Sequence, residues 1–298
     1  MLMRRRIAII GAPLCDGERE LGVEKAPTAI RETGLLDVLR ARAEVVDLGD
    51  ILLQTPAPDR ISGKLRNIEH VVEGCRRVMQ TVADAVHKGL FPLLIGGDCS
   101  LFPGAVAGLT SVHQRIGALY VDGHADFHTS ETTSSGYFSG MALAATVGRD
   151  RRELLPVGEN FPIIREEDVS VLGVRTLNLD PLELRNLERT SLNVITIDSL
   201  RRDGIDKSVE KATEAMQKPL YLHFDLDVID SREMPALAGI RSGVHSSGGL
   251  SYQEAISLCE AFASLPLAGM DTTLYDPDLD RDRICAKRII QLLQTILD

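Results

Sequence analysis

The chain has 298 residues, of which 44% are hydrophobic, so it contains enough apolar material for a sizeable core. Its formal net charge of −10 argues against a nucleic-acid partner, and no apolar stretch approaches the roughly 20 residues of a membrane span. Its five cysteines are scattered without a CxxC pair, which favours a reducing compartment, the cytoplasm, over a disulfide framework.

Apolar runs alternate with helical patterns from one end of the chain to the other. The first run follows three arginines and imitates a signal peptide, but it is short and leads at once into "CDGERE", so we expect a buried strand. In chain order, we expect strands at residues 6–11, 44–48, 90–95, 117–121, 169–174, 193–197, 220–224 and 267–274. The expected helices are 27–41, 66–88, 182–189, 206–218, 251–264 and 280–297. Helix 66–88 shows the clearest apolar face, which makes Cys75 core filling.

Repeated strand–helix units of this kind predict one α/β domain over residues 1–298. Several of the expected strands are apolar without alternation, as in a parallel sheet that is covered on both faces. The pattern fits either an open doubly wound sheet or an eight-stranded barrel. The segments 55–63, 129–140 and 231–249 are long loops rich in Ser, Gly and Pro, and such loops usually carry function.

Polar side chains that could bind ligands or take part in catalysis follow three of the expected strands. In either architecture, ligands bind at the edge where the strands end. The segments are "LLIGGDCS", "ALYVDGHADFHTS" and "LYLHFDLDVID". They supply Asp98, Cys99, Asp122, His124, Asp126, His128, His223, Asp225, Asp227 and Asp230.

The spacing of these acids indicates a metal site. Residues two apart in an extended segment share one side, so Asp122, His124 and Asp126 face together, as do Asp225 and Asp227. Converging carboxylates without cationic partners repel each other, and a divalent cation cancels that repulsion. Oxygen ligands with one imidazole suit Mn²⁺, Zn²⁺ or Fe²⁺. A single Asp after a strand is usually a helix cap or a solvated charge, but two such motifs after apolar runs favour a metal.

His223 stands two residues before Asp225 and could share its face. We expect it to support neighbouring ligands or to pack in the core rather than to bind the metal itself. A nucleophilic Cys99 would need an adjacent base, and His124 is better explained as a ligand. A magnesium phosphatase could use the same acids, but no phosphate-binding glycine loop stands at the right place.

These motifs resemble those of the arginase/agmatinase (ureohydrolase) family, binuclear manganese hydrolases of guanidino or amidino C–N bonds. The N-terminal segment "IAIIGAPLCDGERELGVEKAPTAIRETGLLDVL" is most similar to arginase itself. "GGDCS", "DGHADFH", "SSGYFSGM", "FDLDVID", "SSGGLS" and "LYDPDLD" follow in the family's order, over essentially the whole chain. The resemblance implies an open, mostly parallel eight-stranded sheet with helices on both faces. It also implies a homo-oligomer, a trimer or a hexamer.

The resemblance further implies two manganese sites. One uses the position of Cys99 with Asp122, Asp126 and Asp225; the other uses Asp122, His124, Asp225 and Asp227. A hydroxide held by the metal attacks the amidino carbon, since metal binding lowers the pKa of water. Asp126 would orient that hydroxide and pass its proton onward, and we count Asp126 and His128 as the candidate catalytic residues.

Several positions depart from the family pattern. Cys99 replaces a metal-binding histidine, Ser139 a proton-shuttle histidine, and Leu274 a glutamate that holds the guanidinium group. Two asparagines that contact the substrate carboxylate correspond to His128 and Tyr137, while their neighbouring serine is kept as Ser135. Val244 replaces a threonine. The candidate substrate contacts are therefore His128, Ser135, Tyr137 and Ser139.

These losses favour one retained ion at Asp122, His124, Asp225 and Asp227, with the site at Cys99 weakened or absent. Deacetylase relatives of this fold work with one ion, so hydrolysis stays possible. The leading hypothesis is an arginase-like amidinohydrolase whose guanidino or modified-arginine substrate differs from arginine. The alternatives are an impaired member that acts as an assembly partner or sensor, and a mononuclear amide hydrolase.

Overall fold

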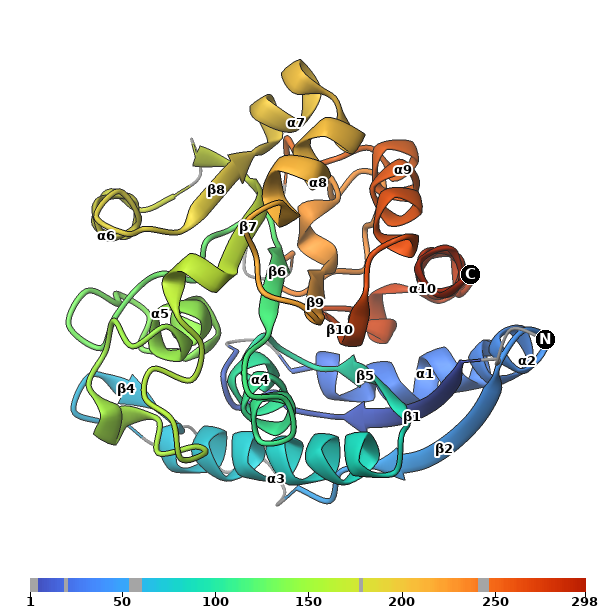
Figure 1. Ribbon diagram of the computed structural model, residues 1–298, viewed down its shortest axis with the longest axis horizontal. Coiled ribbons are helices and arrows are strands. Elements are labelled where there is room, and N and C mark those ends of the chain that lie inside the picture. Colours follow the sequence, from blue (N-terminus) through green and yellow to red (C-terminus); the bar gives the residue numbers. More distant parts are fainter. Residues whose placement is uncertain (1–4, 19–20, 54–60, 177–178, 241–246) are drawn as a thin grey trace.

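Eight parallel strands form the central sheet of the computed structural model (Figure 1), which describes residues 5–18, 21–53, 61–176, 179–240 and 247–298. The strand order is β2-β1-β5-β10-β9-β6-β7-β8, and it does not close into a barrel. The strands are β1 (Arg6–Ala12), β2 (Glu44–Asp50), β5 (Phe91–Gly96), β6 (Gly117–Val121), β7 (Val169–Val174), β8 (Asn193–Thr196), β9 (Leu220–Asp225) and β10 (Leu267–Thr273). A short antiparallel hairpin consists of β3 (Ile61–Ser62) and β4 (Leu65–Arg66). The predicted open α/β sheet is confirmed, and the barrel alternative is wrong.

Helices cover both faces of the sheet, because the inner strands are apolar on both sides. The helices are α1 (Ala26–Glu32), α2 (Leu35–Arg40), α3 (Ile68–His87), α4 (Leu101–Thr110), α5 (Ala142–Thr146), α6 (Pro181–Leu187), α7 (Ile197–Asp203), α8 (Ile205–Thr213), α9 (Tyr252–Ala263) and α10 (Ile284–Leu297). The core on one face contains α3, α4 and α5, and the core on the other contains α1, α2 and α7 to α10 (Figure 1). No helix in the described part of the chain has the length and apolarity of a membrane span.

The structure differs from the sequence prediction mainly in the helices. The predicted helix 27–41 is divided into α1 and α2, because Gly34 has a φ of 107°, outside the helical region. The predicted strand 193–197 ends at Thr196, whose side chain accepts a hydrogen bond from Ser199 N and so begins α7. Helix α4 is buried along most of its length and therefore lacks an amphipathic pattern, so it was not predicted.

Helix α4 fixes the start of the candidate site, since Cys99 lies directly before it. It packs against α3 at close range: a Cβ at Gly104 would lie 2.3 Å from the carbonyl oxygen of Cys75. Cys75 is fully buried, as predicted, and its Sγ donates a hydrogen bond to the carbonyl oxygen of Ser100 at 3.0 Å. The turn after β5 is therefore held rigidly against the core.

Candidate metal centre

Four neighbouring strands, β5, β10, β9 and β6, bring the candidate site together at the carboxyl edge of the sheet. β9 pairs with β6 on one side and with β10 on the other. Val121 lies opposite Phe224, so the residues that follow, Asp122 and Asp225, also emerge next to each other. Cys99 enters from the turn after β5, which is the far neighbour of β10. The sequence predicted this convergence of strand ends correctly.

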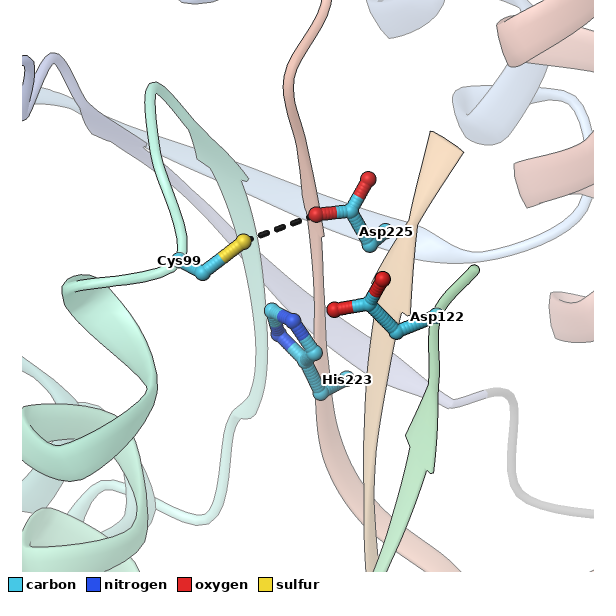
Figure 2. A group of neighbouring side chains, drawn as sticks. All are labelled: Cys99, Asp122, His223 and Asp225. Atoms are coloured by element: carbon cyan, nitrogen blue, oxygen red, sulfur yellow. Dashed lines mark hydrogen bonds between the residues drawn. The ribbon is translucent and has the colours of Figure 1, made fainter. Parts of the chain in front are cut away.

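We call Cys99, Asp122, His223 and Asp225 the inner cluster (Figure 2). Each offers one possible ligand atom, and these four atoms lie within 4.8 Å of one another. All four side chains are buried, with at most 2% of any residue exposed. Cys99 Sγ donates a hydrogen bond to Asp225 Oδ2 at 2.7 Å. The inner cluster therefore combines sulfur, nitrogen and oxygen donors away from solvent.

We call Asp122, His124 and Asp227 the outer cluster, which shares Asp122 with the inner one. His124 Nδ1 lies 2.7 Å from Asp227 Oδ2, and 29% of the His124 side chain is exposed. Gly123 N donates to Asp227 Oδ1 at 3.0 Å, and a guanidinium nitrogen of Arg175 lies 3.5 Å from the same oxygen. The outer cluster is thus the side of the site that faces solvent.

The two clusters differ in their electrostatics. Burial opposes ionisation of Asp227, but His124 and Arg175 outweigh it and hold the pKa of Asp227 below its usual range. Asp227 in turn raises the pKa of His124 to about 9. In the inner cluster, burial and neighbouring carboxylates raise the pKa of Asp225 to about 7 and that of Asp122 well above its usual value. A cation between these acids would stabilise their ionised forms.

A further observation supports the fit of this donor set to a divalent ion. Asp122 Oδ2 and His223 Nε2 are buried and have no hydrogen-bond partner among the described residues. Buried polar atoms in native proteins are almost always paired, with protein, water or a ligand. Two buried polar atoms without a partner, within one cluster of possible ligand atoms, are therefore what a cation site predicts.

Asp126 and His128 lie beyond the end of β6. Asp126 has a φ of 47° and accepts a hydrogen bond from the hydroxyl of Tyr120 at 2.5 Å; burial raises its pKa to about 8. His128 Nε2 lies 3.9 Å from Glu183 Oε2, and its Nδ1 lies 3.4 Å from Thr132 Oγ1. Asp126 thus has a protein partner of its own, whereas His128 stands beside a second carboxylate.

The predicted substrate contacts lie on the loop before α5. Ser139 Oγ donates to Glu18 Oε2 at 3.1 Å, which joins this loop to the segment after β1. The carbonyl oxygen of Ser135 accepts from Arg66 Nε at 3.0 Å, and the Arg66 guanidinium lies 5.3 Å from the centre of the Tyr137 ring. This loop is anchored to the N-terminal part of the chain.

Leu274 lies at the end of β10, in the left-handed region with a φ of 67°. Its backbone N donates to the carbonyl oxygen of Gly97 at 2.8 Å, so it lies beside the turn that carries Cys99. Its side chain is buried with the core on the α3–α5 face. Leu274 therefore brings an apolar surface to this edge. Val244 falls outside the described residues.

Two further acids from the same motifs have structural roles. Asp98 is fully buried and accepts hydrogen bonds from Gly17 N at 3.0 Å and Ser100 N at 2.8 Å. Asp230 accepts two hydrogen bonds from the Arg232 side chain and one from Gly248 N, all at 2.8 Å. Both carboxylates hold loops in place, as the cap interpretation of a single Asp predicts.

Sequence reasoning missed several partners of the site, among them Arg175, Glu183 and Asp271. Asp271 is fully buried in β10, where it contacts His223 and Tyr221. The available signal was a single charged residue in this strand. Its partner became visible only with the strand order.

Comparisons with known proteins identify relatives along nearly the whole chain. The chain matches the Arginase family profile over residues 5–297. An arginase from Brevibacillus brevis is 28% identical, with 99% of this chain and 98% of the relative covered, and one from Bacillus caldovelox is 30% identical with 97% of each covered. The solved structure of the Bacillus caldovelox arginase superimposes with a TM-score of 0.90 at 30% identity, covering 98% of both chains.

Proposed function

Because the chain belongs to the arginase family, we propose that it hydrolyses C–N bonds in linear amidines with the help of divalent metal ions. The observation that carries this proposal is the convergence of Asp122, His124, Asp225 and Asp227 at one edge of the sheet. Three carboxylates and an imidazole fit Mn²⁺ or another divalent ion of similar preference. When bound, such ions supply Lewis acidity and lower the pKa of water toward neutrality.

Protons must move from the attacking water to the departing nitrogen. Asp126 is suited to accept the first proton, because burial raises its pKa to about 8 while the Tyr120 hydroxyl holds the carboxylate in place. His128 is suited to deliver a proton to the leaving amine. Its Nε2 lies 3.9 Å from Glu183 Oε2, so a carboxylate stands beside the nitrogen that would deliver the proton. These roles would replace the shuttle that is lost at Ser139.

The proposed substrate is a guanidino or modified-arginine compound rather than arginine itself. Leu274 offers no charge to a guanidinium group, and loss of a charge-assisted hydrogen bond costs a few kcal/mol. His128, Ser135, Tyr137 and Ser139 remain as polar contacts, and the Ser139 hydroxyl is bonded to Glu18. An apolar group at the position of Leu274 favours a substrate with a substituted, less polar nitrogen end.

The wider setting follows the family resemblance. We propose a cytoplasmic homo-oligomer, a trimer or hexamer, that binds one or two Mn²⁺ ions per chain and a small-molecule substrate. The net charge of −10 supports the absence of a nucleic-acid partner.

The test is a panel of arginine, agmatine, N-substituted arginines and other guanidino compounds, offered to Mn²⁺-loaded protein. Release of urea, ammonia or a substituted urea is the expected result. Leu274→Glu should raise the rate on unsubstituted guanidines relative to the uncharged control Leu274→Gln. If metal-loaded protein releases none of these products from any compound, the hydrolase proposal fails, and a role as assembly partner gains support.

A further inference from the structure

We propose that the inner cluster is a mixed sulfur–nitrogen–oxygen metal site in which His223 Nε2 replaces the imidazole missing at Cys99. Cys99 supplies a thiolate, and Asp122 and Asp225 supply carboxylate oxygens. The proposal deepens the proposed function, on which it rests for the presence of an ion at this edge. It makes His223 a metal ligand, a role that neither its sequence context nor the family resemblance assigns to it.

The position of His223 is the first argument. It stands two residues before Asp225 on β9, so both side chains leave the same face of the strand. Figure 2 shows its ring beside the side chains of Cys99, Asp122 and Asp225. The residue is fully buried, and its Nε2 has no hydrogen-bond partner among the described residues. A buried imidazole nitrogen of this kind needs a partner, which a bound ion would supply.

The second argument is that Asp271 fixes which nitrogen of His223 faces the cluster. Strand pairing sets Asp271 on β10 directly alongside His223, and Asp271 Oδ1 lies 2.7 Å from His223 Nδ1. The Tyr221 hydroxyl donates to the other oxygen of Asp271 at 2.6 Å. A proton on Nδ1 is directed at this carboxylate, so Nε2 is the nitrogen left for the cluster, and in the neutral imidazole it carries a lone pair. Metal-binding histidines typically have such a carboxylate behind them.

The third argument is that the ring of His223 is held in one orientation. Tyr120 on β6 is paired with His223 across the sheet, and the two rings stack with centres 4.2 Å apart and planes 28° apart. Phe102 of α4 packs on the same imidazole with ring centres 5.3 Å apart. The Asp271–His223–Tyr120 row spans three adjacent strands. It positions Nε2 before any ion arrives, which favours binding.

Cys99 determines what kind of ion the cluster prefers. Its Sγ donates to Asp225 Oδ2 at 2.7 Å, so uptake of a divalent ion would form the sulfur–metal bond and release the thiol proton to solvent. Thiolate with imidazole suits Zn²⁺, Co²⁺ or Fe²⁺ better than Mn²⁺. The sequence analysis predicted a weakened site at Cys99 because a histidine is missing there. That prediction did not include the imidazole that His223 supplies to the same cluster. We infer that the inner site is exchanged rather than reduced.

The test is Co²⁺ binding to the full chain, followed by absorption spectroscopy and by metal analysis after dialysis against Co²⁺ or Zn²⁺. The wild type should show a near-ultraviolet sulfur-to-cobalt charge-transfer band. Cys99→Ser should abolish that band, whereas Cys259→Ser, at another fully buried cysteine, should leave it unchanged. His223→Gln should weaken Zn²⁺ binding at least tenfold and shift the cobalt ligand-field bands.

A second pair of variants addresses folding. Asp271→Asn should weaken Zn²⁺ binding roughly 10–100-fold through the tautomer of His223, and Tyr221→Phe should do so less. If His223→Gln fails to fold, Cys99→Ser and Asp271→Asn still decide the matter. A wild type without the sulfur–cobalt band, or Zn²⁺ binding that is unchanged in His223→Gln or Asp271→Asn, would overturn the proposal. These measurements need no substrate, so the two proposals can fail separately. A protein that shows the sulfur–cobalt band but no activity would contradict only the hydrolase proposal. An active protein without the band would contradict only the proposed inner metal site.

Discussion

In the outer cluster, donors surround the carboxylate of Asp227: Gly123 N, His124 and Arg175 all contact it. In the inner cluster, Asp122 Oδ2 and His223 Nε2 are buried without a partner among the described residues. Asp227 is therefore surrounded by donors without an ion, whereas two polar atoms of the inner cluster, one of them on the shared Asp122, have no partner in the described part of the chain. The comparison shows that a match to the family's motifs and the demand for a cation are separate properties. His223, to which the family resemblance assigns no metal, carries one of the two unpaired atoms.

The exposure of the two clusters sharpens the contrast. The His124 side chain is 29% exposed, whereas Cys99 and His223 are buried. An ion at the outer cluster would therefore exchange with solvent more readily than one at the inner cluster. Substitutions at the shared residue, in one cluster alone, and outside both clusters test this contrast.

The largest effect is expected from Asp122→Asn, because Asp122 belongs to both clusters. Ion content should fall at both, and kcat should drop roughly a thousandfold, the equivalent of several kcal/mol of charge stabilisation. Metal analysis and the substrate panel would measure this. Asp206→Asn, which removes one charge from the first turn of α8, is the control. Full ion content in Asp122→Asn would contradict the shared role.

The second prediction separates the clusters. His124→Gln removes the outer imidazole and leaves the Asp271–His223 pair intact. Loss of a residue that supports a metal ligand typically weakens metal binding roughly 10–100-fold, and loss of the ligand itself should weaken Mn²⁺ binding by at least as much. The sulfur–cobalt band should persist. A titration that follows free Mn²⁺ by electron paramagnetic resonance would test it. Loss of the band together with Mn²⁺ binding would mean that the clusters are not distinct sites.

The strand ends and the acidic motifs could be predicted from the sequence, because both depend on local patterns. All eight strands followed from short apolar runs, and the spacing of Asp122, His124, Asp225 and Asp227 placed them together. Helix α4 could not be predicted, since burial removes the polar face on which helix periodicity depends. Nor could the role of His223 be recognised, because Asp271 is 48 residues away in sequence and lies beside it only through the β9–β10 register.

A third prediction concerns the choice of metal. Cys99→His replaces the thiolate by a second imidazole next to His223. The preference for Zn²⁺ over Mn²⁺ should fall by about tenfold, or ~1.4 kcal/mol, because imidazole is a harder ligand than thiolate. Competition dialysis would report the ratio. If Cys99→His instead raises the ion content from one to two per chain, the wild-type inner site is a reduced one.

The smallest effect is expected at Glu254, a carboxylate that has a cationic partner and lies outside both clusters. Glu254 contacts Arg201 and closes the capping box of α9, and Arg201 holds its pKa at about 2, below the ordinary 4.5. Because the pKa of Glu254 is lower in the folded state than in the unfolded state, its ionised carboxylate stabilises the fold at pH values above the unfolded-state pKa. This contribution is lost as the pH falls toward the folded-state pKa. Glu254→Gln should cost about 1 kcal/mol at pH 7, and the difference should vanish between about pH 4.5 and 2. Thermal unfolding across this range would show it, and a pH-independent difference would contradict it.

The shared carboxylate of Asp122 links the affinities of the two clusters for their ions. Because one carboxylate serves both clusters, an ion in the first changes the affinity of the second, and linkage requires the reverse effect to be equal in size. Ions bound at the two clusters would therefore be thermodynamically coupled rather than independent. A softer ion held by Cys99 and His223 would set the affinity for whichever ion the exposed side then takes up. Metal supply could in this way tune activity through an ion held by the buried inner cluster.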